Sequence, residues 1–249
     1  MTVRRFPTTL LLGALLVGGL LVTAIIGALL PAESSIAINI AARLQPLSPA
    51  HPFGTDQYGR DLLQRIAAGA PIAASIALGA VGIALIVGGT LGALAGFYGG
   101  WLGEIFMRAS DALQAFPALL LALTVIAALG TGEFNAMIAI GVVGIPLFAR
   151  LVRASVLAAR TQDYVLAARS IGGDDARILR RHILPNALSP IIVQASIALG
   201  NAMLAEAGLS YLGLGTRPPQ PSWGRMLEEA RTFWDAAPWM AILDRKSVV

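Results

Sequence analysis

The sequence predicts an all-α integral membrane protein, and three observations support this. Of its 249 residues, 56% are hydrophobic and only 13% are charged, whereas about a quarter of the residues in a soluble domain are charged. Uncharged runs long enough to cross a bilayer recur along the chain. Arginines gather in two places that these runs put on the same side of the membrane. The composition therefore argues against a soluble enzyme.

The first predicted span is the uncharged run of residues 9–30. At ~1.5 Å per helical residue it crosses a hydrocarbon core ~30 Å thick. Because Arg4 and Arg5 precede it, a cleaved signal peptide is the alternative. The run is longer than the apolar part of such a peptide, and Pro31-Ala-Glu is a poor cleavage site. We interpret it as a retained helix.

Further apolar runs follow at residues 71–97, 116–130, 136–151 and 188–204. The run at 116–130 is short, so we expect its helix to begin earlier, near residues 104–111. Arg108 and Asp111 are then expected to pair at the inner end of that helix, at i,i+3. The prediction is five complete transmembrane helices and the start of a sixth at Ala237.

Positive charge orients these spans. Arg4 and Arg5 place the N-terminus in the cytoplasm, and four crossings later the chain is inside again. The stretch between Arg150 and Arg181 holds seven arginines and three acidic residues. Both clusters predict the same topology, with residues 31–69, 131–133 and 215–236 outside.

Several kinds of chemistry are not indicated. The chain has no cysteine, and its single lysine, Lys246, follows no glycine-rich loop, so it has no P-loop with which to bind ATP. His51 and His182 are isolated, and neither paired carboxylates nor a Ser/His/Asp set stands out. We expect no enzyme activity, no catalytic residues, no bound metal and no cofactor.

A glycine stripe runs along the second predicted span. Gly88, Gly92, Gly96 and Gly100 recur at every fourth residue, in phase with Ala80 and Ala84. Such a stripe lets another helix approach closely. We interpret it as a packing surface, and a sliding contact during gating is the alternative.

Glu206 is an ionisable residue within an apolar segment. It lies about eighteen residues after the start of the fifth span, roughly 27 Å along a helix. This depth indicates the outer interface of the membrane. An interfacial or inter-helix hydrogen bond is the preferred interpretation, and a proton relay is the alternative.

The cytoplasmic stretch 163–185 predicts two short helices. Residues 164–171 are helix-forming, and Gly172-Gly173 is a C-terminal stop. Asp174 or Asp175 is expected to cap the second helix, and Pro185 to end it. Such a loop is suited to docking a partner, and a basic surface resting on anionic lipid is the alternative.

Residues 166–185 resemble the EAA loop of ABC-transporter permeases, in which Glu-Ala-Ala is followed by a glycine and later by Ile-x-Leu-Pro. Ala167, Ala168, Gly172, Leu184 and Pro185 are in register, whereas Leu166 replaces the usual Glu and His182 the usual Ile. The resemblance implies that the loop, from Asp163 to Pro185, is the coupling element that contacts an ATPase subunit.

Other motifs resemble one branch of that family, the dipeptide/oligopeptide/nickel permeases of the DppC/OppC type. They extend over about residues 50–241 and include Tyr98-Gly-Gly-Trp and Pro218-Pro-Gln-Pro-Ser-Trp-Gly. The family-motif positions that we single out are Gly54, Thr55, Asp56, Gly59, Arg60, Asp61, Glu206 and Gly208.

The resemblance implies a type I ABC importer permease fold and a multi-pass protein of the bacterial inner membrane. Its expected partners are a second homologous permease, two ATPases that bind ATP and Mg²⁺, an extracytoplasmic binding protein and membrane lipid, but no nucleic acid. The chain would form half of the pathway for di- or oligopeptides. A stand-alone secondary transporter or channel is the alternative, although midplane ionisable groups and inverted repeats are not evident.

The expected organisation is an N-terminal helix with the start of an external loop in residues 1–50 and a permease domain in residues 51–243. The segment from Ala237 to Leu243 is too short to cross a membrane. The last six residues, Asp-Arg-Lys-Ser-Val-Val, match the translation of a sequence that resembles a common sequencing adapter. We therefore expect residues 244–249 to be a non-native tail on a chain truncated at its C-terminus, with a natural short variant as the alternative.

Overall fold

The computed structural model describes residues 8–31 and 33–241, with the side chains of residues 9, 10 and 102 excepted. Arg4, Arg5 and Lys246, together with the expected tail 244–249 and the end of the sixth span, lie outside the described residues. Within the described ranges the chain is almost entirely helical and forms no β-sheet, only a bridge between Thr55 and Asp61.

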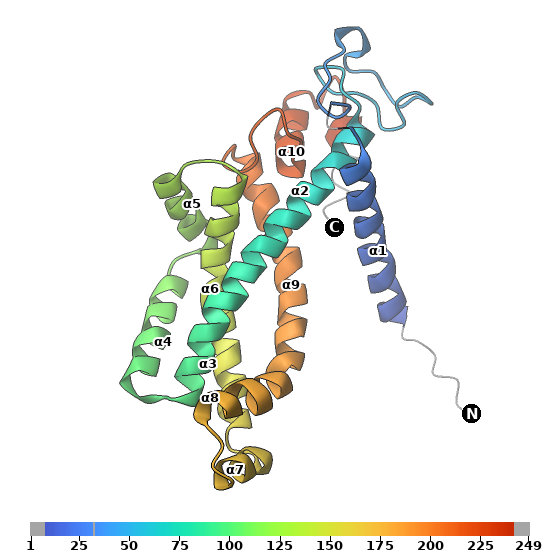
Figure 1. The fold of residues 1–249 in the computed structure, drawn as a ribbon. Coiled ribbons are helices and arrows are strands. Elements are labelled where there is room, and N and C mark those ends of the chain that lie inside the picture. The colour runs from blue at the N-terminus through green and yellow to red at the C-terminus, as the bar shows by residue number, and fades with distance from the viewer. Residues whose placement is uncertain (1–7, 32, 242–249) are drawn as a thin grey trace, which may run out of the picture. The chain divides into compact units, whose positions relative to one another are not determined.

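Figure 1 traces the helices in chain order. Short helical turns of other types are η1 (Ile40–Ala42, 3₁₀), η2 (Ala84–Gly88, π) and η3 (Leu179–Ile183, π). The α-helices are α1 (Thr8–Leu29), α2 (Leu62–Ile83), α3 (Gly89–Phe97), α4 (Gly100–Gln114), α5 (Ala118–Leu129), α6 (Glu133–Ala159), α7 (Asp163–Ser170), α8 (Asp175–Ile178), α9 (Leu184–Tyr211) and α10 (Trp223–Thr232).

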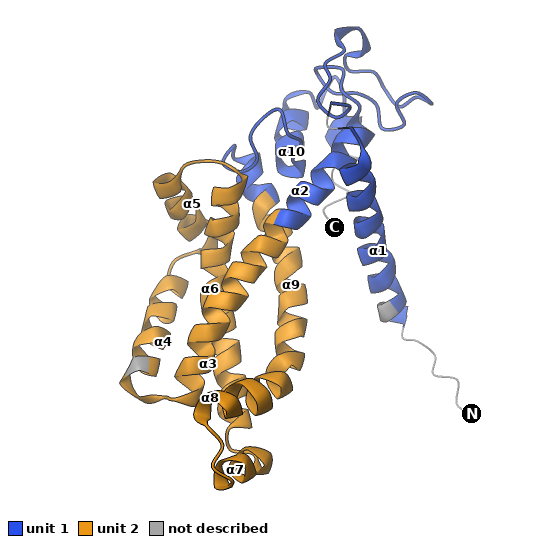
Figure 2. Ribbon diagram, viewed as in Figure 1, with its two compact units in different colours: residues 1–75, 207–249 blue, residues 76–206 orange. Residues whose placement is uncertain are grey.

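The chain divides into two compact units, coloured in Figure 2. Unit 1 comprises residues 1–75 and 207–249, and unit 2 comprises residues 76–206. In unit 1, α1 approaches α2 so closely that a Cβ on Gly27 would collide with the carbonyl of Ala67. In the same unit α10 is held to α2 by a hydrogen bond of 3.0 Å from the Trp223 indole to the Ile66 carbonyl.

Unit 2 is built on the close packing of η2 and α3 against α6. A Cβ on Gly88 or on Gly92 would collide with the α6 backbone, and one on Gly96 would lie 2.9 Å from the Arg153 carbonyl. A glycine on α6 contributes to the same close packing, because a Cβ on Gly144 would lie only 2.8 Å from the Cβ of Ala84. Gly100, however, is not part of this stripe. It has a φ of +66° in the turn that starts α4, and nothing lies within 4 Å of an added Cβ.

Four helical stretches are long and apolar enough to cross a membrane, or five if a broken helix pair counts as one span; this holds for the described residues. The stretches are Leu11–Leu29, Leu62–Phe97, Glu133–Ala159 and Asp175–Tyr211. The broken pair corrects the prediction of one continuous third helix. Its parts, α4 and α5, are bent by 96°, because Pro117 disfavours helical backbone at the residue before it.

The expected pair of Arg108 and Asp111 is also wrong. Asp111 instead accepts a hydrogen bond of 3.0 Å from Arg150 of α6. The bend between α4 and α5 brings α4 beside α6, where the two helices are in contact. Asp111 therefore pairs with Arg150 of the neighbouring helix α6 and not with Arg108 of its own helix.

The stop signal at Gly172-Gly173 is confirmed. The amide of Gly173 donates to the Ala168 carbonyl at 3.0 Å, and that of Gly172 donates to Arg169 at 2.9 Å. These two bonds are the Schellman motif that ends a helix. Gly172 supplies the left-handed residue, with φ +80°.

The second half of the loop differs from the prediction. Asp174 stands at the N-cap of α8, but its side chain makes no cap hydrogen bond. Pro185 does not end the helix, since α8, η3 and α9 form one helical stretch from Asp175 to Tyr211. The π turn η3 ends at Ile183, two residues before the proline, and its wider hydrogen-bond spacing accommodates a residue that lacks an N–H. Segment 215–236, which was expected as an external loop, contains α10.

We predict that Gly92→Ala destabilises the protein by about 1–3 kcal/mol, because the new methyl group must push α3 away from the Ala149 backbone. The matched control is Gly82→Ala, at a helical glycine with nothing within 4 Å of an added Cβ. Thermal stability in detergent, followed by size-exclusion chromatography, measures both. Equal stability of the two variants would contradict the packing described above.

Candidate functional site

The loop of residues 163–185 has one buried and one exposed side. Val165, Ala168 and Ile178 are buried in a cluster with Phe97 of α3 and Val156 of α6. Arg160 adds two hydrogen bonds, in which its guanidinium donates to the carbonyls of Gly96 and Phe97 at 3.1 and 3.3 Å. These contacts join the loop firmly to the ends of α3 and α6.

The exposed side of the loop carries apolar residues. Leu166 is 50% exposed and Ile171 is 88% exposed, and Ala167 between them is also exposed. Grouped apolar side chains that stay exposed at a helix and its C-terminal end, while the other side of the helix is buried, form a candidate docking surface. We call Leu166, Ala167 and Ile171 the docking tip.

The remaining predicted loop residues surround this tip. Asp163 is exposed in the first turn of α7, where its charge favours the helix N-terminus. The carbonyl of His182 accepts a hydrogen bond from the Asn186 side chain at 2.6 Å. Leu184 packs on the buried cluster, whereas Pro185 is exposed. Of the two adjacent alanines, Ala167 is exposed whereas Ala168 is buried and faces inward.

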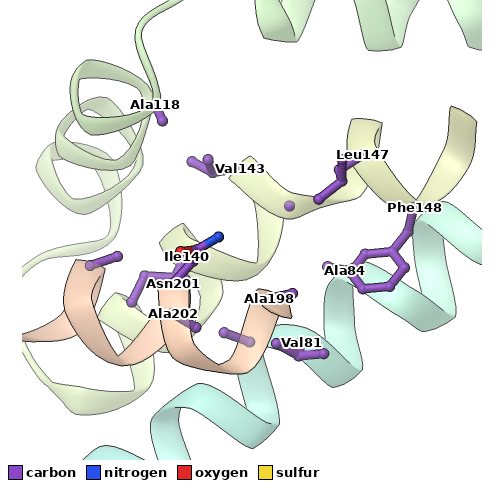
Figure 3. Close-up of a pocket in the computed structure, with 13 residues that line it drawn as sticks. Val81, Ala84, Ala118, Ile140, Val143, Leu147, Phe148, Ala198, Asn201 and Ala202 are labelled. Carbon is purple, nitrogen blue, oxygen red and sulfur yellow. The ribbon is translucent and has the colours of Figure 1, made fainter. Parts of the chain in front are cut away.

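A second feature of unit 2 is an apolar hollow of about 250 Å³. Figure 3 shows side chains from α2, α5, α6 and α9 around it, with the carboxamide of Asn201 among them. The sequence interpretation missed Asn201, although an amide within an apolar span is itself a signal. The lining comprises Ala80, Val81, Ala84, Ala118, Ile140, Val143, Gly144, Leu147, Phe148, Ala198, Asn201, Ala202 and Ala205.

In unit 1 the family-motif residues form a buried charge cluster. The Asp56 carboxylate accepts hydrogen bonds from the Arg60 amide at 2.9 Å and from Arg60 Nε at 2.6 Å. Arg65 of α2 lies 3.3 Å from the same carboxylate. Glu229 of α10 pairs with both arginines, at 3.3 and 3.5 Å. The two carboxylates thereby neutralise two buried guanidinium groups. Burying these guanidinium groups without a partner would strongly destabilise the fold.

Arg65 and Glu229 were missed by the sequence interpretation. Arg65 is the only charged residue of α2, and such a charge in an apolar helix implies a buried partner. Glu229 is 169 residues away from Arg60, so no sequence spacing could pair them. Arg225 also reaches Glu229, at 3.4 Å on the same helix.

The other motif residues shape the backbone around this cluster. Gly54 and Gly59 have φ values of +76° and +72°, which only glycine adopts readily. Thr55 is fully buried and bridges the Ala42 carbonyl and the Gln45 amide. Asp61 caps α2 by accepting from the Gln64 amide at 3.0 Å, and its second oxygen lies 2.8 Å from His51 Nδ1.

The last two motif positions lie near the end of α9. Glu206 is 1% exposed, so its carboxylate is within the protein and away from solvent. Gly208 has nothing within 4 Å of an added Cβ. Among the described residues no group of three His, Cys, Asp or Glu side chains is arranged to hold a metal ion.

Residues 88–243 match the model of a family described as the binding-protein-dependent transport system inner membrane component. This match covers more than half of the chain. The chain belongs to this family. It is therefore an inner-membrane permease component of a binding-protein-dependent transport system, and the four or five candidate spans of the described residues agree with this.

Individual relatives agree with this assignment. The chain is 42% identical to the dipeptide transport system permease protein DppC of Alkalihalophilus pseudofirmus, over 96% of this chain and 79% of that protein. It is 45% identical to the glutathione transport system permease protein GsiD of Pectobacterium atrosepticum, over 78% of this chain and 65% of that one. The match thus spans just under two thirds of the glutathione permease.

A solved structure shows the same fold. An inward-facing form of the MetNI methionine ABC transporter superposes with a TM-score of 0.59 at 17% identity, over 74% of this chain and 89% of that chain. This confirms the expected type I importer permease fold.

We predict that Asp56→Asn destabilises the protein by about 3–5 kcal/mol, because it leaves Arg60 and Arg65 buried with half of their negative charge removed. The control is Asp111→Asn, which breaks a pair whose side chains are 49% and 63% exposed and should cost about 0–1 kcal/mol. Thermal unfolding in detergent compares them. A loss at Asp56 no larger than at Asp111 would refute the role of the buried cluster.

Proposed function

We propose that this chain is one permease subunit of an ABC importer for peptides and forms half of its pathway. The names of its relatives support peptide cargo, since the dipeptide and glutathione permeases both serve peptide substrates. The second half of the pathway would come from a second, homologous permease. An extracytoplasmic binding protein would deliver the peptide, as the family description implies.

Coupling to ATP is proposed to occur at the docking tip. The observation that carries this proposal is the contrast between Ile171, which is 88% exposed, and Val165 of the same loop, which is fully buried. An exposed apolar tip on a firmly anchored base can enter a cleft of an ATPase and transmit force. Two ATPase subunits, each with its own ATP and Mg²⁺, would then serve two permeases.

A movement of the loop can be transmitted to the hollow through a single helical stretch. The loop continues directly into the 37-residue helical stretch Asp175–Tyr211, and this stretch contributes Asn201 and Ala202 to the hollow. A displacement of α8 by the ATPases would therefore move one wall of the hollow. Such a movement favours one conformation of the permease only if the ATPases contact the two conformations differently. Closure of the ATPases would supply that difference.

The proposed topology follows from this coupling. The docking tip must face the cytoplasm, where ATP is, so the N-terminus lies in the cytoplasm as well and residues 31–61 and α10 lie outside. The buried charge cluster would then stabilise the external side of the permease. Residues 51–243 are proposed as the permease domain, with α1 as an added helix.

No feature of the described residues favours the alternative of a stand-alone secondary transporter or channel. Reconstitution distinguishes the two classes. Peptide uptake by this chain and its partner permease without any ATPase would overturn the proposed function.

We predict that Ala167→Arg lowers co-purification of the ATPase with the permease by about tenfold or more, since a clash of about 1.4 kcal/mol in the interface already costs tenfold. Arginine is a good helix former, so α7 should persist. Gly172→Arg, at the Schellman glycine, should abolish the interaction too.

The control is Ala158→Arg, the same substitution at an exposed residue of α6 outside the loop. It should leave the amount of co-purified ATPase unchanged. If Ala167→Arg and Ala158→Arg retain equal amounts of ATPase, the docking tip is not the coupling site.

We predict opposite labelling of two single-cysteine variants, because the chain contains no natural cysteine. Ala176→Cys in α8 should react with a membrane-impermeant maleimide only in inside-out vesicles. Ala50→Cys, in the segment before α2, should react only in intact spheroplasts. Both alanines are exposed. Labelling of both variants from the same side would contradict the proposed topology.

A further inference from the structure

The hollow in unit 2 is apolar in all but one of its lining side chains. Twelve of the thirteen residues around it are alanine, valine, isoleucine, leucine, glycine or phenylalanine, and the other is Asn201. Figure 3 shows the Asn201 carboxamide directed into the hollow among side chains of α6, including Ile140 and Val143. Among the residues that the structure describes, no charged side chain lines this space.

Asn201 lies on a membrane-spanning stretch, residues 175–211, yet its carboxamide is exposed. No hydrogen bond joins it to another side chain or backbone group in the described parts of the chain. A polar amide left against lipid would cost several kcal/mol in a bilayer. The carboxamide therefore needs a polar partner, and water or a polar solute in the hollow that it lines can supply one.

The chemistry of the hollow suits an uncharged polar group. A carboxamide offers one acceptor and two donors, which is the complement of a peptide group with its carbonyl and N–H. The apolar wall suits side chains of varied kind and would bind ions poorly. The volume of about 250 Å³ is below the usual range of complete ligand sites, ≈ 300–1,000 Å³, as expected for half of a shared pathway.

Two helices at the hollow have irregular backbone. The π turn η2 begins at Ala84, a lining residue, and π turns allow local changes in helix register. Pro146 lies inside α6 between the lining residues Gly144 and Leu147. Because proline has no N–H, the Val142 carbonyl receives no helical hydrogen bond from it. The walls can therefore adjust around a passing solute.

We propose that Asn201 is a specificity-determining residue, whose carboxamide hydrogen-bonds peptide groups of the cargo as they cross the hollow. This inference rests on the proposed function. It assigns recognition of the peptide backbone to the permease itself, and the apolar wall leaves the side chains of the cargo unselected.

The test uses the complete importer, with partner permease, ATPases and binding protein, reconstituted in proteoliposomes. The probes are dialanine and its analogue methylated at the peptide nitrogen, which lacks the N–H donor. ATP-driven uptake of both is measured for the native chain and for Asn201→Leu. The binding protein is common to both chains, so its own preference cancels when the two uptake ratios are divided.

We expect the preference for dialanine over its methylated analogue to be ~5–10-fold smaller in Asn201→Leu than in the native chain, the effect of one hydrogen bond. Asn201→Gln, which keeps the carboxamide, should restore most of it. The control Ser196→Ala removes a hydroxyl on α9 that bonds its own helix, to the Ile192 carbonyl, and should keep the native ratio.

Co-purification of the four components verifies assembly, and Asn201→Ser replaces Asn201→Leu if the larger side chain prevents it. An unchanged ratio in an importer that takes up dialanine overturns the role of Asn201 and leaves the proposed function standing. If the native importer takes up neither peptide with ATP, the proposed function fails, and this inference fails with it.

Discussion

The close approach of η2 and α3 to α6 is the contact on which the rest of unit 2 depends. Helices in lipid gain little from the hydrophobic effect and associate by packing, so small residues at the contact are decisive. Gly88 and Gly92 let the α6 backbone come within a distance that any Cβ would block. At one end of this pair Phe97 and Val156 pack beneath the loop of residues 163–185, and further along it Ala84 and Phe148 line the hollow.

Unit 1 is organised by a different interaction. Two arginines and two carboxylates from the 51–61 segment, α2 and α10 share one buried cluster. Removing water from these charges is expensive, and their mutual pairing offsets that cost only with good geometry. Gly54 and Gly59, both with positive φ, supply the tight backbone that brings Asp56 to Arg60.

The continuous stretch from α8 through α9 connects the two sites of unit 2. Local sequence at its start contains signals that usually end a helix, in Pro185 and Pro190, yet the helix persists. Prolines in a membrane helix are tolerated where neighbouring groups and local π turns satisfy the freed backbone. As a result Asn201 lies on a helical stretch that begins four residues after Ile171 of the docking tip.

The sequence by itself determined the membrane class, the positions of most spans and the end of α7 at Gly172, because hydropathy, arginine clusters and a left-handed glycine are local signals. It also determined, through ordered motifs, the family. Only the tertiary structure decided that Asp111 pairs with Arg150 and that Gly100 leaves the stripe. Likewise, the partnership of Asp56, Arg65 and Glu229 and the place of Asn201 at the hollow join residues far apart in the chain. Such contacts depend on how helices pack against one another, which local spacing does not encode.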